Sequence, residues 1–224
     1  MSFQTIIDNA TYLTIDKRKV TAFSVSRSGH VKTAERNPST YTLTVGTHDG
    51  LKYSTNRGVL EDIDTSDRII ESNISLANNT GMTYITNYQG NLSVSQQAQI
   101  DVNGASGNDL YIDFSNITGA TTDYTVFLKK GDYIQPKGNT STYRYPYQVT
   151  EDVAYTSGAN SNITVNVHRP VLSQTGVSLT GGHGVRLGSD VRFHVKALQC
   201  PTYNVIPYDR ISFNGDFVFQ EIIT

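Results

Sequence analysis

The chain has 224 residues, of which 17% are charged, and its formal net charge at pH 7 is −2. Neutralising several phosphates requires a surplus of Lys and Arg, so this composition argues against nucleic-acid binding as the main function and against a basic membrane-binding patch. Cys200 is the single cysteine, which excludes an intramolecular disulfide.

Strands are predicted to dominate the first 50 residues. Alternation of apolar and polar side chains predicts an early strand pair over 10–20 and 21–26, and a third strand over 40–45 (TYTLTV). The composition agrees, because Tyr, Thr, Ser, Asn and Gly are plentiful, Trp is absent, and the residues that favour helices are sparse.

One helix is predicted after this strand region. Ser54 or Thr55 can cap its N-terminus by accepting a backbone N–H bond. Val59, Leu60 and Ile63 fall on one helical face, with Glu61 and Asp62 on the other, which predicts an amphipathic helix.

The middle of the chain returns to a strand pattern, clearest over 82–88 (MTYITNY). We interpret 97–188 as a second domain inserted into a first domain made of 1–96 and 189–224. The segment 181–190 (GGHGVRLGSD) is expected to be a flexible return, after which the closing strands have partners only in the N-terminal half.

The segments 127–172 and 191–221 alternate apolar and polar residues with period two, which predicts antiparallel strands around a small barrel. The fold class expected from the whole chain is therefore all-β, mainly antiparallel, with one short helix.

Candidate ligand clusters do not match the spacing that metals require. The segment that starts at Asp62 resembles a calcium loop, but Asp67 stands where the sixth position needs Gly, and Asn73 where the twelfth needs Glu. His168 and His194 lie in period-two strands among apolar neighbours, so we expect exposed or interface rings with no third zinc ligand nearby. No metal and no cofactor is predicted.

Catalytic motifs are also lacking. The glycines of 181–188 are not followed by the lysine of a phosphate-binding loop, and no Gly-x-Ser-x-Gly elbow occurs. Glu151 and Asp152 are adjacent and would point to opposite faces of a strand. We therefore predict no catalytic residue and no enzymatic activity.

Tyrosine is the remaining candidate for a functional surface. Tyrosines cluster in the predicted second domain, where Tyr124 and Tyr133 accompany four candidates for contact with a partner protein or a sugar ring: Tyr143, Tyr145, Tyr147 and Tyr155. The alternative is aromatic pairing between strands inside the sheet.

Targeting signals are not evident at the N-terminus. It has no basic start followed by a long apolar run, so we expect synthesis in a cytoplasm without a signal peptide. Seven Asn-x-Ser/Thr triplets are interpreted as a consequence of a composition rich in these residues.

Several short motifs resemble structural proteins of tailed bacteriophages. They are GDYIQP (131–136), YPYQVTEDV (145–153), NITVNVHRPV (162–171), GVRLGSDVRFHV (184–195) and FNGDFVFQE (213–221). The organisation is most similar to the distal tail protein group, in which a tail-tube-like β-barrel carries an inserted small β-barrel of the oligonucleotide/oligosaccharide-binding type.

The resemblance implies a homo-oligomer, a hexameric ring at the end of the tail tube, located in the virion. Implied partners are the tail tube protein, the baseplate hub or tail tip and receptor-binding proteins, and DNA would pass through the channel without specific binding. Tube, terminator and baseplate proteins remain alternatives, as do a carbohydrate-binding module that uses Tyr143, Tyr145 and Tyr147, and a hydrolase of another β fold.

Overall fold

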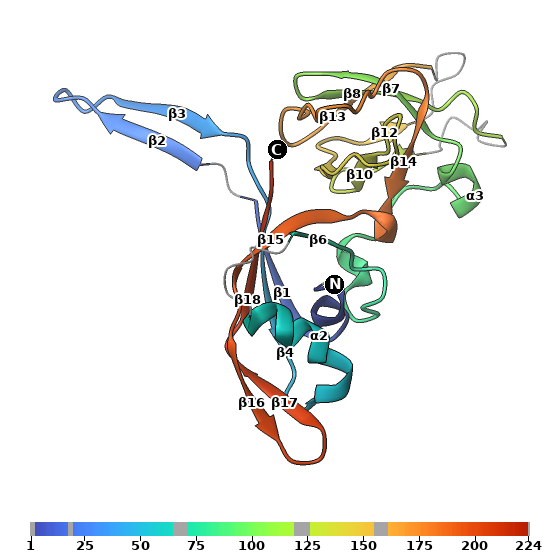
Figure 1. Ribbon diagram of the computed structural model, residues 1–224. Helices are drawn as coiled ribbons and strands as arrows, with labels where there is room; N and C mark the ends of the chain where they lie inside the picture. The colour runs from blue at the N-terminus through green and yellow to red at the C-terminus, as the bar shows by residue number, and fades with distance from the viewer. Residues whose placement is uncertain (1–2, 18–19, 65–70, 119–125, 155–160, 224) are drawn as a thin grey trace. The chain divides into compact units, whose positions relative to one another are not determined.

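The computed structural model describes residues 3–17, 20–64, 71–118, 126–154 and 161–223. Within these residues the fold is all-β and mostly antiparallel, and α2 (Tyr53–Asp64) is the one helix of seven or more residues. The chain forms two compact units, which we call unit 1 (residues 1–73 and 194–223) and unit 2 (residues 74–193). Unit 2 therefore interrupts unit 1 in the sequence (Figure 1).

The inserted unit is longer than the predicted span 97–188 at both ends. It begins at Ile74, and Leu92, which precedes the predicted start, is buried in its core with Tyr88 packed against it. It continues to Phe193, whose ring contacts Tyr133 at 6.0 Å between centroids. The turn signals after residue 97 mark the first hairpin of the inserted unit. The segment before that hairpin also belongs to the unit, because its side chains pack on the same core.

The described residues of unit 1 form two helices and ten strands, two of which cross the boundary of the unit. They are α1 (Gln4–Asp8), β1 (Ala10–Asp16), β2 (Val20–Val25), β3 (Val31–Asn37), β4 (Thr42–Thr47), β5 (Leu51–Lys52), α2, β6 (Glu71–Ile74), β15 (Phe193–Gln199), β16 (Thr202–Ile206), β17 (Arg210–Asn214) and β18 (Phe217–Glu221).

The main sheet of unit 1 has the strand order β1-β4-β18-β15-β6. The closing strand β18 pairs antiparallel with β4, so Phe217 lies opposite Val45 and Phe219 opposite Leu43. All four side chains are buried, because alternate residues of both strands face the same side. The ring of Phe3 joins them, 5.3 Å from that of Phe219. The closing strands thus pair with the N-terminal half, as the sequence predicted.

The early strands pair differently from the prediction. β1 pairs with β4. Among the described residues β2 pairs only with β3, a strand that the sequence pattern did not predict. The period-two pattern located β1, β2 and β4 but carried no information on which strands pair, because pairing depends on the connections between them.

Helix α2 packs on the sheet formed by β16, β17 and β5. Leu60 of the helix meets Leu51 and Ile211 in a small buried cluster, with Tyr203 and Phe213 packed against it. The predicted helix and its buried face are confirmed. Its N-terminal cap is not Ser54 or Thr55: the backbone N–H of Ser54 donates to Asp209, a carboxylate 155 residues away in sequence.

In unit 2, the part of the chain that the structure describes forms eight short strands, one α-helical turn and two 3-10 turns. They are η1 (Thr83–Ile85), α3 (Val94–Gln97), β7 (Asp101–Ser106), β8 (Asp109–Asp113), β9 (Val126–Leu128), β10 (Tyr133–Pro136), β11 (Tyr147–Gln148), β12 (Val153–Ala154), β13 (Ile163–Asn166), β14 (His183–Leu187) and η2 (Gly188–Asp190).

Six of these strands form one sheet in the order β11-β10-β14-β7-β8-β13, and part of it curls into a half-barrel. Its core is continuous and includes Val102, Leu110, Ile134 and Val165. Two predicted features of this region are wrong. Residues 82–88 form no strand but contain the 3-10 turn η1 at 83–85, and 183–187 form the paired strand β14 where a flexible return was expected.

The reason for the first difference is local turn chemistry. The N–H groups of Met82 and Thr83 both donate to the carbonyl of Asn79, at 2.9 and 3.0 Å. These turn bonds compete with strand pairing and outweigh the apolar alternation of the segment.

Candidate functional site

The predicted tyrosine surface lies inside the protein. Tyr143, Tyr145 and Tyr147 are 2%, 0% and 0% exposed, so they cannot stack on a sugar or contact a partner. This corrects the prediction of a tyrosine platform for those three residues. The fourth, Tyr155, lies outside the residues that the structure describes. Aromatic packing within the unit accounts for the cluster, since the ring of Tyr145 meets that of Tyr143 edge-on at 5.4 Å.

Hydrogen bonds explain why tyrosine rather than phenylalanine occupies two of these positions. The N–H of Leu172 donates to the hydroxyl of Tyr147 at 2.8 Å, and the hydroxyl of Tyr143 donates to the carbonyl of Leu172 at 2.7 Å. The two hydroxyls are 2.5 Å apart, so Tyr147 donates to Tyr143 and closes the circle. Burial, and then the neighbouring Tyr147, raise the pKa of Tyr143, which keeps it a donor.

The two histidine rings were expected to be exposed or at an interface, and the ring of His194 is not exposed. Its ring is buried, with Nδ1 3.0 Å from Oδ1 of Asn73 and Nε2 3.3 Å from the carboxylate of Glu71. His168 is half-buried and accepts the backbone N–H of Gln148 at 3.0 Å. Both rings therefore brace neighbouring segments of the fold.

Metal-binding arrangements are not found in the described parts of the chain, where no three His, Cys, Asp or Glu side chains come together. The candidate calcium loop that starts at Asp62 falls largely within 65–70, outside the described residues.

An exposed surface stands out at the tip of the β2–β3 hairpin, which we call the hairpin tip (residues 25–32). Val25 and Val31 lie opposite each other at the end of the strands and are 59% and 62% exposed. Arg27, His30 and Lys32 are exposed beside them. An exposed apolar pair flanked by the cationic side chains of Arg27 and Lys32 is typical of a contact surface rather than of a loop that faces only water.

The turn of the hairpin tip is held by its own hydrogen bonds. The N–H of Ser26 donates to the carbonyl of His30 at 2.9 Å, and the N–H of His30 returns to the hydroxyl of Ser26 at 3.1 Å. Gly29 takes a positive φ of 79°, which a glycine adopts without strain. The tip is therefore ordered in advance of any contact, which reduces the entropy lost on binding.

Charge is distributed very unevenly in unit 1. Residues 17–37 carry six basic residues and one acidic residue, a net charge of +5, whereas the rest of unit 1 carries five basic and eleven acidic residues, a net charge of −6. Unit 2, with seven basic and eight acidic residues, has a net charge of −1. The whole-chain charge of −2 conceals this separation, and a count by segment would have revealed it from the sequence.

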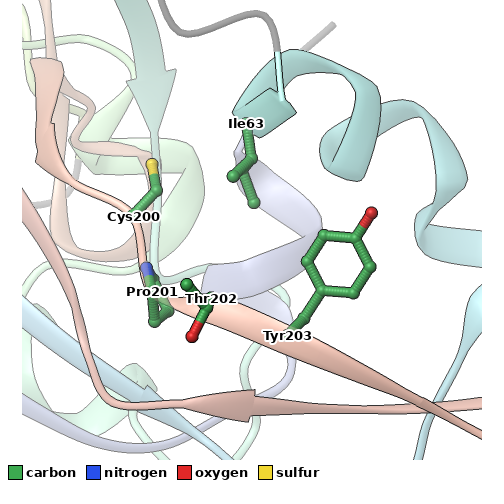
Figure 2. Close-up of a pocket in the computed structure, with 5 residues that line it drawn as sticks. All are labelled: Ile63, Cys200, Pro201, Thr202 and Tyr203. Atoms are coloured by element: carbon green, nitrogen blue, oxygen red, sulfur yellow. The ribbon is translucent and has the colours of Figure 1, made fainter.

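A cavity of about 440 Å³ opens elsewhere on unit 1. Ile63, in the last turn of α2, lines it from one side, and the β15–β16 junction lines it from the other (Figure 2). The junction residues at the cavity are Cys200, Pro201, Thr202 and Tyr203. Burial raises the pKa of the Cys200 thiol, so it lacks the lowered pKa of a reactive cysteine.

The last turn of α2, to which the cavity residue Ile63 belongs, is acidic in sequence. Residues 61–64 include Glu61, Asp62 and Asp64, and the Glu61 side chain is 71% exposed. The C-terminal end of a helix also carries a partial negative charge, because its last carbonyl groups point along the axis. An apolar cavity beside an acidic helix end can therefore accept an apolar group that is accompanied by cations.

Comparison with known proteins identifies no relative: no protein-family model matches this chain, and no curated protein matches it. No helix in the described residues is long and apolar enough to cross a membrane.

Proposed function

We propose that this protein is a non-enzymatic structural subunit of a bacteriophage tail, where identical copies form a ring at the distal end of the tail tube. In this role unit 1 forms the ring, and unit 2 adjoins the baseplate or tail tip and the receptor-binding proteins. The proposal combines the motif resemblance with the all-β, discontinuous organisation of the chain, in which one β unit is inserted in another.

The β2–β3 hairpin is the observation that carries the assembly part of the proposal. The two strands form a sheet of their own and pair with no third strand in the described residues. A two-stranded ribbon is marginally stable in water by itself, so an apolar pair at its tip indicates that a further surface completes it. In an assembly of identical copies, a contact between two different surfaces of the same unit repeats head to tail, and it closes into a ring when the rotation between neighbouring copies returns to the first one.

Burial of the tyrosine cluster favours this structural role over a carbohydrate-binding module. A stacking platform needs exposed rings, and the three described candidates are in the core.

Negative-stain electron microscopy of the purified full chain, with its mass measured in solution, tests the proposal. Rings with an open central channel are expected. A protein that stays monomeric over its soluble concentration range, or that forms only open chains, would contradict the ring.

A further inference from the structure

The geometry and charge of unit 1 point to a specific contact between copies: we propose that the hairpin tip of one copy docks into the cavity between α2 and the β15–β16 junction of the next copy. This inference depends on the proposed self-assembly, but not on closure of the ring or on its place in a virion.

Apolar surface on both sides supports the contact. The tip presents Val25 and Val31 as a cross-strand pair, and the cavity presents Ile63, Pro201 and Tyr203. Burying two exposed valines in a cavity that they can enter removes apolar surface of both copies from water at once. A small apolar anchor in a pocket is the usual centre of a protein interface.

Charge supports the same pairing and gives it a direction. Arg27 and Lys32 flank the valines, with no acidic residue anywhere in 25–32. Glu61 lies one helical turn from the end of α2 and pairs with Arg57 at 3.5 Å, and Asp62 and Asp64 follow it in sequence. Opposite charge around an apolar centre steers two surfaces together and fixes their orientation.

A second copy of this chain fits better than nucleic acid as the occupant of the tip. Outside residues 17–37, unit 1 has a net charge of −6, which attracts the basic hairpin of another copy and repels phosphates. The exposed valine pair also needs an apolar surface to cover it, and a phosphate backbone offers none.

Cys200 lies in the cavity and provides a site-specific test. In the full chain, Val31→Cys treated with a mild oxidant is expected to form disulfides between copies, seen as a ladder on a non-reducing gel. Adding Cys200→Ser should remove the ladder, and Thr140→Cys, at an exposed turn of unit 2, should not produce one. A link within one chain, or a ladder that persists without Cys200, overturns the contact.

Charge reversal tests the electrostatic part. The variant R27E/K32E changes two exposed residues, and circular dichroism can check that it folds. It should weaken self-association about tenfold or more and make it less dependent on salt. Sedimentation at salt concentrations below and above roughly 0.15 M measures both effects. The matched control K129E/K130E makes the same change of charge on exposed residues of unit 2 and should behave as the unmodified protein.

Thr202→Trp should also weaken association by filling the cavity. Unchanged association in both the charge-reversed and the cavity-filled variants overturns the inference. The inference is also overturned if R27E/K32E abolishes DNA binding in a gel-shift assay but leaves self-association unchanged, because the hairpin tip would then bind nucleic acid rather than another copy.

The two proposals can be separated by their outcomes. Rings that survive the tip reversal would leave the proposed function in place and remove this contact. A ladder with the expected controls, but only open chains in the microscope, would support the contact and remove the ring.

Discussion

Gly90 illustrates how closely single residues are packed in unit 2. A Cβ atom at this position would lie 2.1 Å from the hydroxyl of Tyr88 and 2.7 Å from the carbonyl oxygen of Phe127, two groups that are hydrogen-bonded to each other. The side chain of Tyr88 could move only by giving up that bond, and the carbonyl belongs to the backbone of β9.

We therefore expect Gly90→Ala to lower the free energy of unfolding by about 1–3 kcal/mol, the usual cost of overpacking. Urea denaturation measures this change. Gly184→Ala is the control, because its Cβ would meet no atom closer than 3.6 Å and the residue has an ordinary φ. Equal losses in the two variants would contradict the steric explanation.

The circle of hydrogen bonds around Tyr147 gives a second prediction at the residue scale. Tyr147→Phe keeps the ring but leaves the N–H of Leu172 and the hydroxyl of Tyr143 short of one partner each. We expect a loss of about 1–3 kcal/mol in the free energy of unfolding, since buried polar groups lose their partners. Tyr84→Phe, at a largely exposed position, should change stability little, and a similar loss there would argue against the circle.

At the scale of elements, one buried carboxylate organises the turn between β9 and β10. Asp132 accepts the backbone N–H of Gln89 at 2.8 Å and that of Lys129 at 2.9 Å. It therefore ties the segment before α3 to the turn. Burial raises the pKa of Asp132 despite these two bonds, which lower it.

A raised folded-state pKa means that the folded protein holds this proton more tightly than the unfolded chain. The contribution to stability is then complete below the ordinary pKa of 3.8 and is lost as the pH rises through the folded value. Asp132→Asn should remove this contribution to the fall in stability with rising pH. Urea unfolding at a series of pH values above 3.8 can measure the difference. The same pH dependence in both proteins would contradict the prediction.

At the N-terminus of helix α2 the shift in pKa, and therefore the dependence of stability on pH, has the opposite sign. The hydroxyl and the N–H of Ser54 both donate to Asp209, at 2.6 and 2.8 Å, and these bonds lower the pKa of Asp209. Its stabilising effect is present above the ordinary pKa of 3.8 and is lost as the pH falls through the lowered value. Asp209→Asn should therefore make the stability of unit 1 less sensitive to acid, as hydrogen exchange at α2 can report. An unchanged loss of protection on acidification would show that the cap is not responsible.

At the scale of the whole molecule, the discontinuous chain makes the closing strand essential to unit 1. Phe217 of β18 is fully buried opposite Val45, and its ring meets that of Phe213 edge-on, with 4.9 Å between the centroids. Phe217→Ala should destabilise unit 1 by about 3–5 kcal/mol through the cavity it leaves.

The core of unit 2 contains only its own residues, so it should keep its protection against hydrogen exchange in the Phe217→Ala protein. Exchange measured by mass spectrometry on peptides from both units separates the two cases. Simultaneous loss in both units would mean that they fold as one cooperative body.

Local patterns in the sequence were sufficient for the all-β class, for helix α2 and for the positions of β1, β2 and β4. Apolar alternation and helical periodicity are properties of consecutive residues, and these elements follow them. The pairing of the closing strands with the N-terminal half was also inferred correctly, because by elimination no other partners remained in the sequence.

The tertiary structure decided what depends on residues far apart in the chain. Whether Tyr143, Tyr145 and Tyr147 face water or the core, and whether Asp209 caps α2, are settled by packing between distant segments. By contrast, the uneven distribution of charge in unit 1 can be found from the sequence alone, by counting the charged residues of 17–37. The cavity beside Cys200 exists only because α2 and the β15–β16 junction, more than a hundred residues apart in the chain, lie on either side of it.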